Sequence, residues 1–303
     1  MADLVVELTA PNGVHYSQPT GLFINNGFVS ASGQTITSID PATDKPIATV
    51  HAARAADVDR AVNAAKAALV HPSWKKLPGA DRGQLMGRLA DLMEKNKDGW
   101  ADKTFGQTIS TTPQKFAYTT RQPLGPTLVC GNTVVLKPAE QTPLSILVFA
   151  KLVKVAGFPP GVVNIVNGLG REAGAALVSH QLVDKLAFTG STMTAREIAA
   201  GTLKNITLET GGKSPLLVFS DADLDQAVKW SHFGIMSNQG QICTATSRIY
   251  VHQDISQEFL GRFKEVVETT SKIGDQWDES TFQGPQVTRV VCDRRLSHVS
   301  GIP

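Results

Sequence analysis

Cys243 is the residue of this sequence best suited to covalent chemistry. It follows Ser-Asn-Gln-Gly-Gln-Ile, a glycine-containing stretch behind a helix expected to start near Ala222. A thiolate is a strong nucleophile, but an ordinary cysteine, with a pKa of about 8.5, is only slightly ionised at neutral pH. A nearby helix N-terminus or cofactor charge would lower that pKa. Taken alone, a cysteine is more often a small buried hydrophobic side chain.

Glu209 is a candidate general base. It ends the expected strand Asn-Ile-Thr-Leu-Glu and precedes Thr210-Gly211-Gly212. A carboxylate at the C-terminal end of a sheet strand is well placed for a site, and partial burial would raise its pKa toward the range of a general base. An ordinary salt-bridged glutamate is the alternative. The other two cysteines suggest no chemistry: Cys130, beside Gly131, is expected to be buried, and Cys292 lies in the tail.

These residues need a scaffold, and the chain from Thr133 onward alternates short apolar runs with helical patterns. The expected strands cover 133–136, 162–166, 185–188, 206–209 and 216–219. The helix between the first two strands should end at Gly157. This βαβαβ order predicts an α/β fold with a Rossmann-like, doubly wound parallel sheet.

The N-terminal part predicts smaller elements. Asn25-Asn26-Gly27 between apolar residues indicates a hairpin with Asn-Gly at its tip. Asp57 is expected to cap a helix, and a second helix should span Asp81 to Lys97. Residues 115–121 alternate as a β-arm, which is either a surface hairpin or a strand that reaches another subunit.

Two segments could bind a nucleotide. Phe188-Thr189-Gly190-Ser191 joins a strand to a helix, where free backbone N–H groups and the helix dipole attract phosphate, although such junctions also occur without ligands. Lys137 and Glu140 follow the first expected strand and could bond ribose hydroxyls; a surface ion pair is the alternative. A carboxylate there would repel a 2′-phosphate, which favours NAD over NADP. A strict G-x-G-x-x-G is absent.

Composition excludes several classes of protein. The formal net charge of +2, from 29 basic and 27 acidic residues, gives no argument for a nucleic acid or a membrane as partner. The seven histidines show no metal-ligand spacing, so no metal is expected. Three cysteines do not make a disulfide framework, and no signal segment or membrane-length apolar run occurs. We therefore expect a cytoplasmic protein.

Four motifs together resemble those of the NAD(P)-dependent aldehyde dehydrogenase family. Residues 208–215, Leu-Glu-Thr-Gly-Gly-Lys-Ser-Pro, resemble its glutamate motif. Residues 238–243, Asn-Gln-Gly-Gln-Ile-Cys, resemble its cysteine motif, and Cys243 lies 34 positions after Glu209, as in the family. Residues 131–144 and 187–192 are similar to its cofactor motifs, in the same order, and Gly170 and Gly174 occupy cofactor-loop positions.

The resemblance implies NAD-dependent oxidation of an aldehyde, a small-molecule substrate, to a carboxylic acid, with NADP as the alternative cofactor. Cys243 would attack the aldehyde, and Glu209 would activate the water that hydrolyses the thioester. The residues expected to bind the cofactor are Lys137, Glu140, Gly170, Gly174, Phe188, Gly190 and Ser191. Residues 1–210 would form the NAD-binding domain, with an oligomerisation arm at 112–123 for a homo-oligomer. Residues 211–303 would form an incomplete catalytic domain.

The sequence also departs from the family pattern. Family segments are missing after Asp98 and after Gly125, and the end of the chain is shortened. The segment lost after Gly125 normally supplies a core strand of the cofactor sheet and the asparagine of the oxyanion hole, for which no residue here can be assigned. Such a donor is typically worth ~10²–10³ in turnover. A catalytically impaired remnant that binds nucleotide or a partner chain is therefore the alternative function.

Overall fold

The computed structural model describes residues 4–9, 13–96, 124–276, 278 and 280–299, so the expected arm at 112–123 lies outside the described residues. The chain divides into two compact units. Unit 1 contains residues 1–40, 44–188 and 196–207, and unit 2 contains residues 41–43, 189–195 and 208–303.

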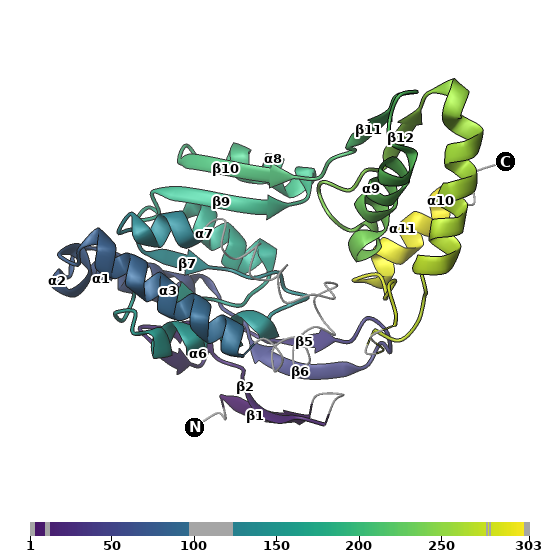
Figure 1. Ribbon diagram of the computed structural model, residues 1–303. Coiled ribbons are helices and arrows are strands. Elements are labelled where there is room, and N and C mark those ends of the chain that lie inside the picture. Colours follow the sequence, from purple (N-terminus) through teal and green to yellow (C-terminus); the bar gives the residue numbers. More distant parts are fainter. Residues whose placement is uncertain (1–3, 10–12, 97–123, 277, 279, 300–303) are drawn as a thin grey trace. The chain divides into compact units, whose positions relative to one another are not determined.

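Unit 1 is built on a four-stranded sheet (Figure 1). Its strand order is β4-β3-β8-β7, with bounds Gly27–Val29, Leu22–Ile24, Val163–Ile165 and Val134–Leu136. β7 and β8 pair in parallel, whereas β3 is antiparallel to both β4 and β8. Two antiparallel pairs accompany this sheet: β1 (Val5–Thr9) with β2 (His15–Pro19), and β5 (Thr35–Ile39) with β6 (Pro46–His51).

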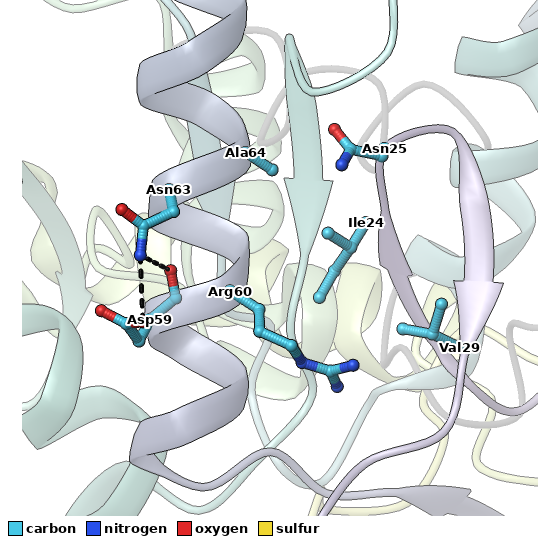
Figure 2. A pocket seen from close by; sticks show the side chains of 7 residues that line it. All are labelled: Ile24, Asn25, Val29, Asp59, Arg60, Asn63 and Ala64. Atoms are coloured by element: carbon cyan, nitrogen blue, oxygen red, sulfur yellow. Dashed lines mark hydrogen bonds between the residues drawn. The ribbon is translucent and has the colours of Figure 1, made fainter.

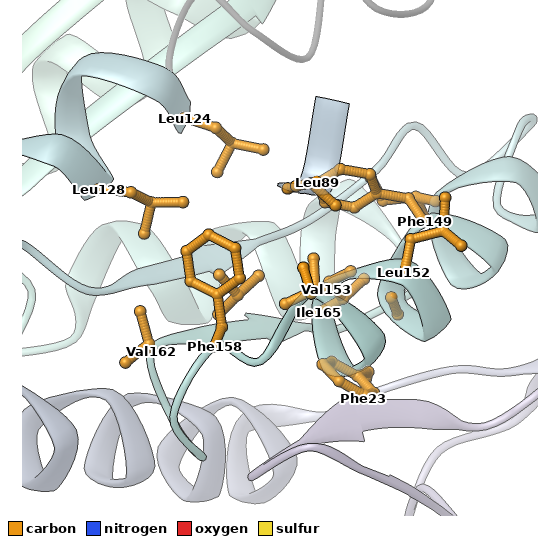
Figure 3. Close-up of a cluster of buried hydrophobic side chains, with 14 of the residues drawn as sticks. Phe23, Leu89, Leu124, Leu128, Phe149, Leu152, Val153, Phe158, Val162 and Ile165 are labelled. Atoms are coloured by element: carbon orange, nitrogen blue, oxygen red, sulfur yellow. The ribbon is translucent and has the colours of Figure 1, made fainter. Parts of the chain in front are cut away.

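Helices cover both faces of this sheet. They are α1 (Ala55–Val70), α2 (Pro72–Lys75), α3 (Gly79–Lys95), α6 (Leu144–Ala156), the π-helical turn η1 (Gly170–Gly174) and α7 (Ala175–Ser179). Side chains alternate across a strand, so Phe23 of β3 joins a core with α3 and α6, whereas Leu22 and Ile24 join a second core with α1 and α7. Figure 3 shows the first core, whose members include Leu89, Leu128, Phe158 and Ile165. Unit 1 is thus a helix–sheet–helix sandwich.

Several local predictions are confirmed with small shifts. The hairpin forms, but its two-residue tip is Asn25-Asn26, with φ of 53° and 59°, and Gly27 begins β4. Two positive φ angles are those of a type I′ turn, which matches the twist of the flanking strands. α6 ends at Gly157, whose φ is +92°. Asp57 is not the N-cap of α1, because Arg54 holds that position; the Asp57 carboxylate instead accepts the Arg54 N–H from inside the first turn.

The expected strands 185–188 and 206–209 form as β9 (Lys185–Gly190) and β10 (Asn205–Thr210). They pair only with each other among the described strands, so the parallel sheet expected to run through them and β7 is divided. Their apolar side chains Leu186, Phe188, Ile206 and Leu208 are only half-buried. A core strand expected to be missing after Gly125 would leave the sheet divided in this way.

Unit 2 contains a βαβ element that positions Cys243. β11 (Pro215–Val218) pairs in parallel with β12 (Arg248–Val251), and α9 (Leu224–Met236) and α10 (Ser256–Thr270) pack on them around Val218, Val228 and Phe259. The short 3-10 turns η2 (Ser237–Gly240) and η3 (Gln253–Ile255) and the helix α11 (Arg289–Val299) complete it. α8 (Thr192–Gly201) has residues in both units. Over the described part of the chain, no helix has the length and apolarity to cross a membrane.

Candidate functional site

Cys243 lies on a tightly turned loop directly after α9. Asn238, Gln239 and Gly240 have φ of 53°, 54° and 67°, so three successive residues adopt the left-handed conformation before the cysteine. Cys243 is exposed. Cys130 is exposed as well, so the expectation that it is buried is wrong. It follows a helical segment at 124–129, where Leu124 and Leu128 take the buried positions and leave Cys130 at the outer end.

The segment after Glu209 lies against the cysteine loop inside unit 2. A Cβ atom added to Gly212 would stand 2.9 Å from the carbonyl oxygen of Cys243, a distance that real side chains avoid. Only glycine therefore permits this approach of the two main chains. Glu209 itself, at the end of β10, is exposed rather than partly buried. The structure brings the glutamate and cysteine motifs together through their backbones.

Four of the expected cofactor residues converge in unit 1, at the C-terminal ends of β7 and β8. The Lys137 Nζ donates to the carbonyls of Pro138 (2.8 Å) and Gly168 (2.9 Å). Burial lowers the pKa of Lys137, and the Glu140 carboxylate opposes that shift. Glu140 Oε2 accepts the backbone N–H of Gly170 at 3.0 Å. A Cβ at Gly174 would meet the Lys137 side chain at 3.5 Å, so the two are neighbours.

The strand–helix junction that includes Phe188, Gly190 and Ser191 forms as expected. β9 carries Phe188 and ends at Gly190, and α8 begins at Thr192. Ser191 Oγ accepts the N–H of Thr194 at 3.1 Å, which makes Ser191 the cap of α8. Phe188 belongs to unit 1, whereas Gly190 and Ser191 belong to unit 2.

Sequence reasoning missed two cavities that involve none of these residues. Figure 2 shows the first, of about 540 Å³, in unit 1 between the β3–β4 hairpin and the α1 residues Asp59, Arg60 and Asn63. The second, of about 890 Å³, lies in unit 2 between α9 and α10, with Trp230, Phe233 and Phe282 in its wall. The signal in the sequence was the pair of aromatic residues Trp230 and Phe233, three positions apart on an expected helix. The structure shows that both side chains are exposed. Over the described residues no group of His, Cys, Asp and Glu side chains has the arrangement of a metal site.

The profile of the aldehyde dehydrogenase family matches residues 28–102 and 117–301. An aldehyde dehydrogenase of Emericella nidulans is 43% identical, and the alignment covers 99% of this chain and 71% of the relative. That alignment runs over 357 positions, more than the 303 residues of this chain, so stretches of the relative have no counterpart inside it. The internal shortening expected from the motifs is therefore confirmed.

Solved structures agree with the sequence comparison. A putative aldehyde dehydrogenase from Burkholderia cenocepacia is similar with a TM-score of 0.86 at 38% identity, covering 93% of this chain and 69% of that one. The aldehyde dehydrogenase from Bacillus cereus, solved as its NAD⁺ complex, is similar with a TM-score of 0.83 at 35% identity and the same coverage. The α/β fold class is thus confirmed. The chain belongs to the aldehyde dehydrogenase family.

Proposed function

We propose that this protein oxidises an aldehyde to a carboxylic acid with NAD as cofactor, through Cys243 as nucleophile and Glu209 as general base. The observation that carries the proposal is the close approach of the Gly212 and Cys243 backbones, which joins the two motifs within one unit. Both side chains are exposed, so substrate and water have access to them.

Each residue has a defined role in this proposal. The Cys243 thiolate adds to the aldehyde carbon and forms a thiohemiacetal. NAD, when bound, supplies the hydride acceptor. Glu209 then takes a proton from water as that water attacks the resulting thioester, which releases the carboxylic acid and restores the thiol. Water supplies the second oxygen of the acid.

The cluster in unit 1 fits a dinucleotide by the chemistry of its groups. Lys137 offers N–H donors and Glu140 offers carboxylate acceptors to ribose hydroxyls, and Gly170 leaves open space beside its backbone. Gly174 belongs to the same cluster. Phe188, Gly190 and Ser191 remain proposed cofactor residues, because the start of α8 offers backbone N–H groups that suit a phosphate. A carboxylate beside the ribose favours NAD over NADP. The NAD⁺ complex of the Bacillus cereus relative supports this choice.

Replacement of single cysteines tests the nucleophile. Cys243→Ala should abolish aldehyde-dependent NADH formation, whereas Cys130→Ala, which removes another exposed cysteine, should leave it unchanged. NADH absorbance during turnover measures both. Activity that persists in Cys243→Ala would show that another group is the nucleophile.

A second candidate function is nucleotide binding without turnover. The missing oxyanion-hole asparagine and the separation of β9 and β10 from the main sheet favour it. Titration calorimetry with NAD distinguishes the cases when combined with the assay: binding without NADH formation supports the remnant, and folded protein that does not bind NAD excludes both functions. The proposed function also includes the assembly of a homo-oligomer through residues 112–123 and a location in the cytoplasm.

A further inference from the structure

The turn before Cys243 adopts a backbone conformation that its side chains do not favour. Asn238 and Gln239 have φ of 53° and 54° and are followed by Gly240 at 67°. Asparagine and glycine tolerate the left-handed region, but for glutamine this conformation is unfavourable. A run of such residues persists only where surrounding contacts hold it.

One segment, residues 283–287, supplies three hydrogen bonds to the turn and its flanks. Gln283 Nε2 donates to the carbonyl of Met236 at 2.6 Å, at the end of α9. The Gly284 N–H donates to Gln239 Oε1 at 2.9 Å, in the amide orientation that satisfies both ends of the side chain. The Val287 N–H donates to Gln241 Oε1 at 3.1 Å. All of these residues lie in unit 2.

The side-chain amides of Gln239 and Gln241 make different hydrogen bonds. Gln239 is buried, with 7% of its surface exposed, and its Nε2 donates to the carbonyl of Asn238 at 3.1 Å while its Oε1 accepts from Gly284. It therefore needs both a donor and an acceptor, which only an amide of this length provides at neutral pH. Gln241 makes its good bond to the Val287 N–H as an acceptor alone, and its own donor reaches Asn238 O only at 3.5 Å.

We propose that Gln239 and Gln241 are positioning residues, which fasten the left-handed turn before Cys243 to the segment 283–287 and so set the direction of the thiol. Neither side chain needs to touch substrate or cofactor for this role. The role of the thiol rests on the proposed function. The hydrogen bonds of the Gln239 and Gln241 side chains to residues 283–287, which we call the tether, are a property of the fold. A displacement of a reacting group by about 1 Å can reduce turnover ~100-fold.

The different chemistry of the two glutamines defines the test. Gln239→Glu keeps the acceptor but replaces the donor with a carboxylate facing the Asn238 carbonyl, so the tether should break. Gln241→Glu keeps the acceptor that Val287 uses, so the hydrogen bond from the Val287 N–H should persist, whereas Gln241→Leu should lose it. Gln257→Glu, an identical change at an exposed position of α10, is the control for charge.

Two readouts separate the tether from the chemistry. Amide hydrogen exchange should show faster exchange at Gly284 and Val287 in Gln239→Glu and Gln241→Leu, by on the order of 10-fold, and no change in Gln241→Glu or Gln257→Glu. In the aldehyde assay the first two variants should lose about 10- to 100-fold in kcat with KM nearly constant. Thermal melts followed by circular dichroism confirm that each variant is folded.

The outcomes are distinct. Wild-type exchange and kcat in folded Gln239→Glu would overturn the inference, as would equal effects of Gln239→Glu and Gln241→Glu. Wild-type protein that turns over no aldehyde would contradict the proposed function. The hydrogen-exchange data would still decide whether the tether exists. Should Gln239→Glu fail to fold, the comparison of Gln241→Leu with Gln241→Glu gives the same decision.

Discussion

Asp57 accepts four hydrogen bonds at the start of α1. The donors are the N–H and hydroxyl of Ser32, the N–H of Arg54 and the guanidinium of Arg60, at distances from 2.7 to 3.0 Å. Burial would raise the pKa of this carboxyl, but the hydrogen bonds from Ser32, Arg54 and Arg60 outweigh it and hold the pKa below its usual value. The charged form of Asp57 therefore contributes to stability.

Asp57→Ala should destabilise the fold by about 2–3 kcal/mol near neutral pH, because it removes a buried carboxylate that accepts four hydrogen bonds. The native pKa of Asp57 lies below the unfolded value, so its contribution is complete above the unfolded pKa of about 4 and is lost as pH falls through the native pKa. Urea unfolding at several pH values measures this. A difference between variant and wild type that grows in acid would contradict the assignment.

Replacement of glycine by alanine should have opposite effects on stability at two positions. Gly161 has φ of +81°, and an added Cβ would lie 2.6 Å from the Ala64 carbonyl oxygen, so Gly161→Ala should destabilise by at least about 2 kcal/mol. Gly87 lies on the exposed face of α3 with open space around it, so Gly87→Ala should stabilise by about 0.5–1 kcal/mol. Thermal melts compare the two, and a common sign of the two shifts would refute the argument.

At the scale of elements, the sequence predicts most of the strands and helices. Periodicity places β7, β8 and α6 because their apolar side chains face the buried cores, and Gly157 marks the end of α6. The pattern cannot reveal that the sheet is divided, because Leu186 and Phe188 have the same apolar pattern whether or not another strand pairs with theirs. The close approach of the Gly212 backbone to the Cys243 backbone is likewise a contact between segments distant in sequence, which no local pattern encodes.

The ribbon formed by β9 and β10 should be less stable than the four-stranded sheet. A two-stranded ribbon with half-buried apolar side chains lacks the packing that protects backbone hydrogen bonds. We expect its amides to exchange on the order of 100-fold faster than those of β3 and β8 in the core of unit 1. Exchange measured by mass spectrometry tests this, and equal protection of the two sheets would mean that the ribbon is as well supported as the sheet in the core.

At the scale of the whole molecule, the two units differ in the size of their cores. The two apolar clusters of unit 1 include Phe23, Trp74 and Phe158, all nearly inaccessible, whereas the cluster of unit 2 contains only three buried side chains, Val218, Val228 and Phe259, among the described residues. Apolar burial stabilises a fold by roughly 25 cal/mol per Å² removed from water. The smaller core of unit 2 therefore predicts a smaller free energy of unfolding for that unit.

Unit 2 should consequently unfold at a lower urea concentration than unit 1, so the protein should not behave as a two-state system. Hydrogen exchange at increasing urea reports each unit through its own peptides, with α9 and α10 for unit 2 and α6 and β8 for unit 1. Phe259→Ala should move only the first transition, by about 3–5 kcal/mol for a buried phenylalanine, and Phe158→Ala only the second. If both units lost protection at the same urea concentration, and each substitution moved both transitions equally, the two cores would unfold as one cooperative structure. The loop that carries Cys243 would then be as stable as the cluster around Lys137 and Glu140.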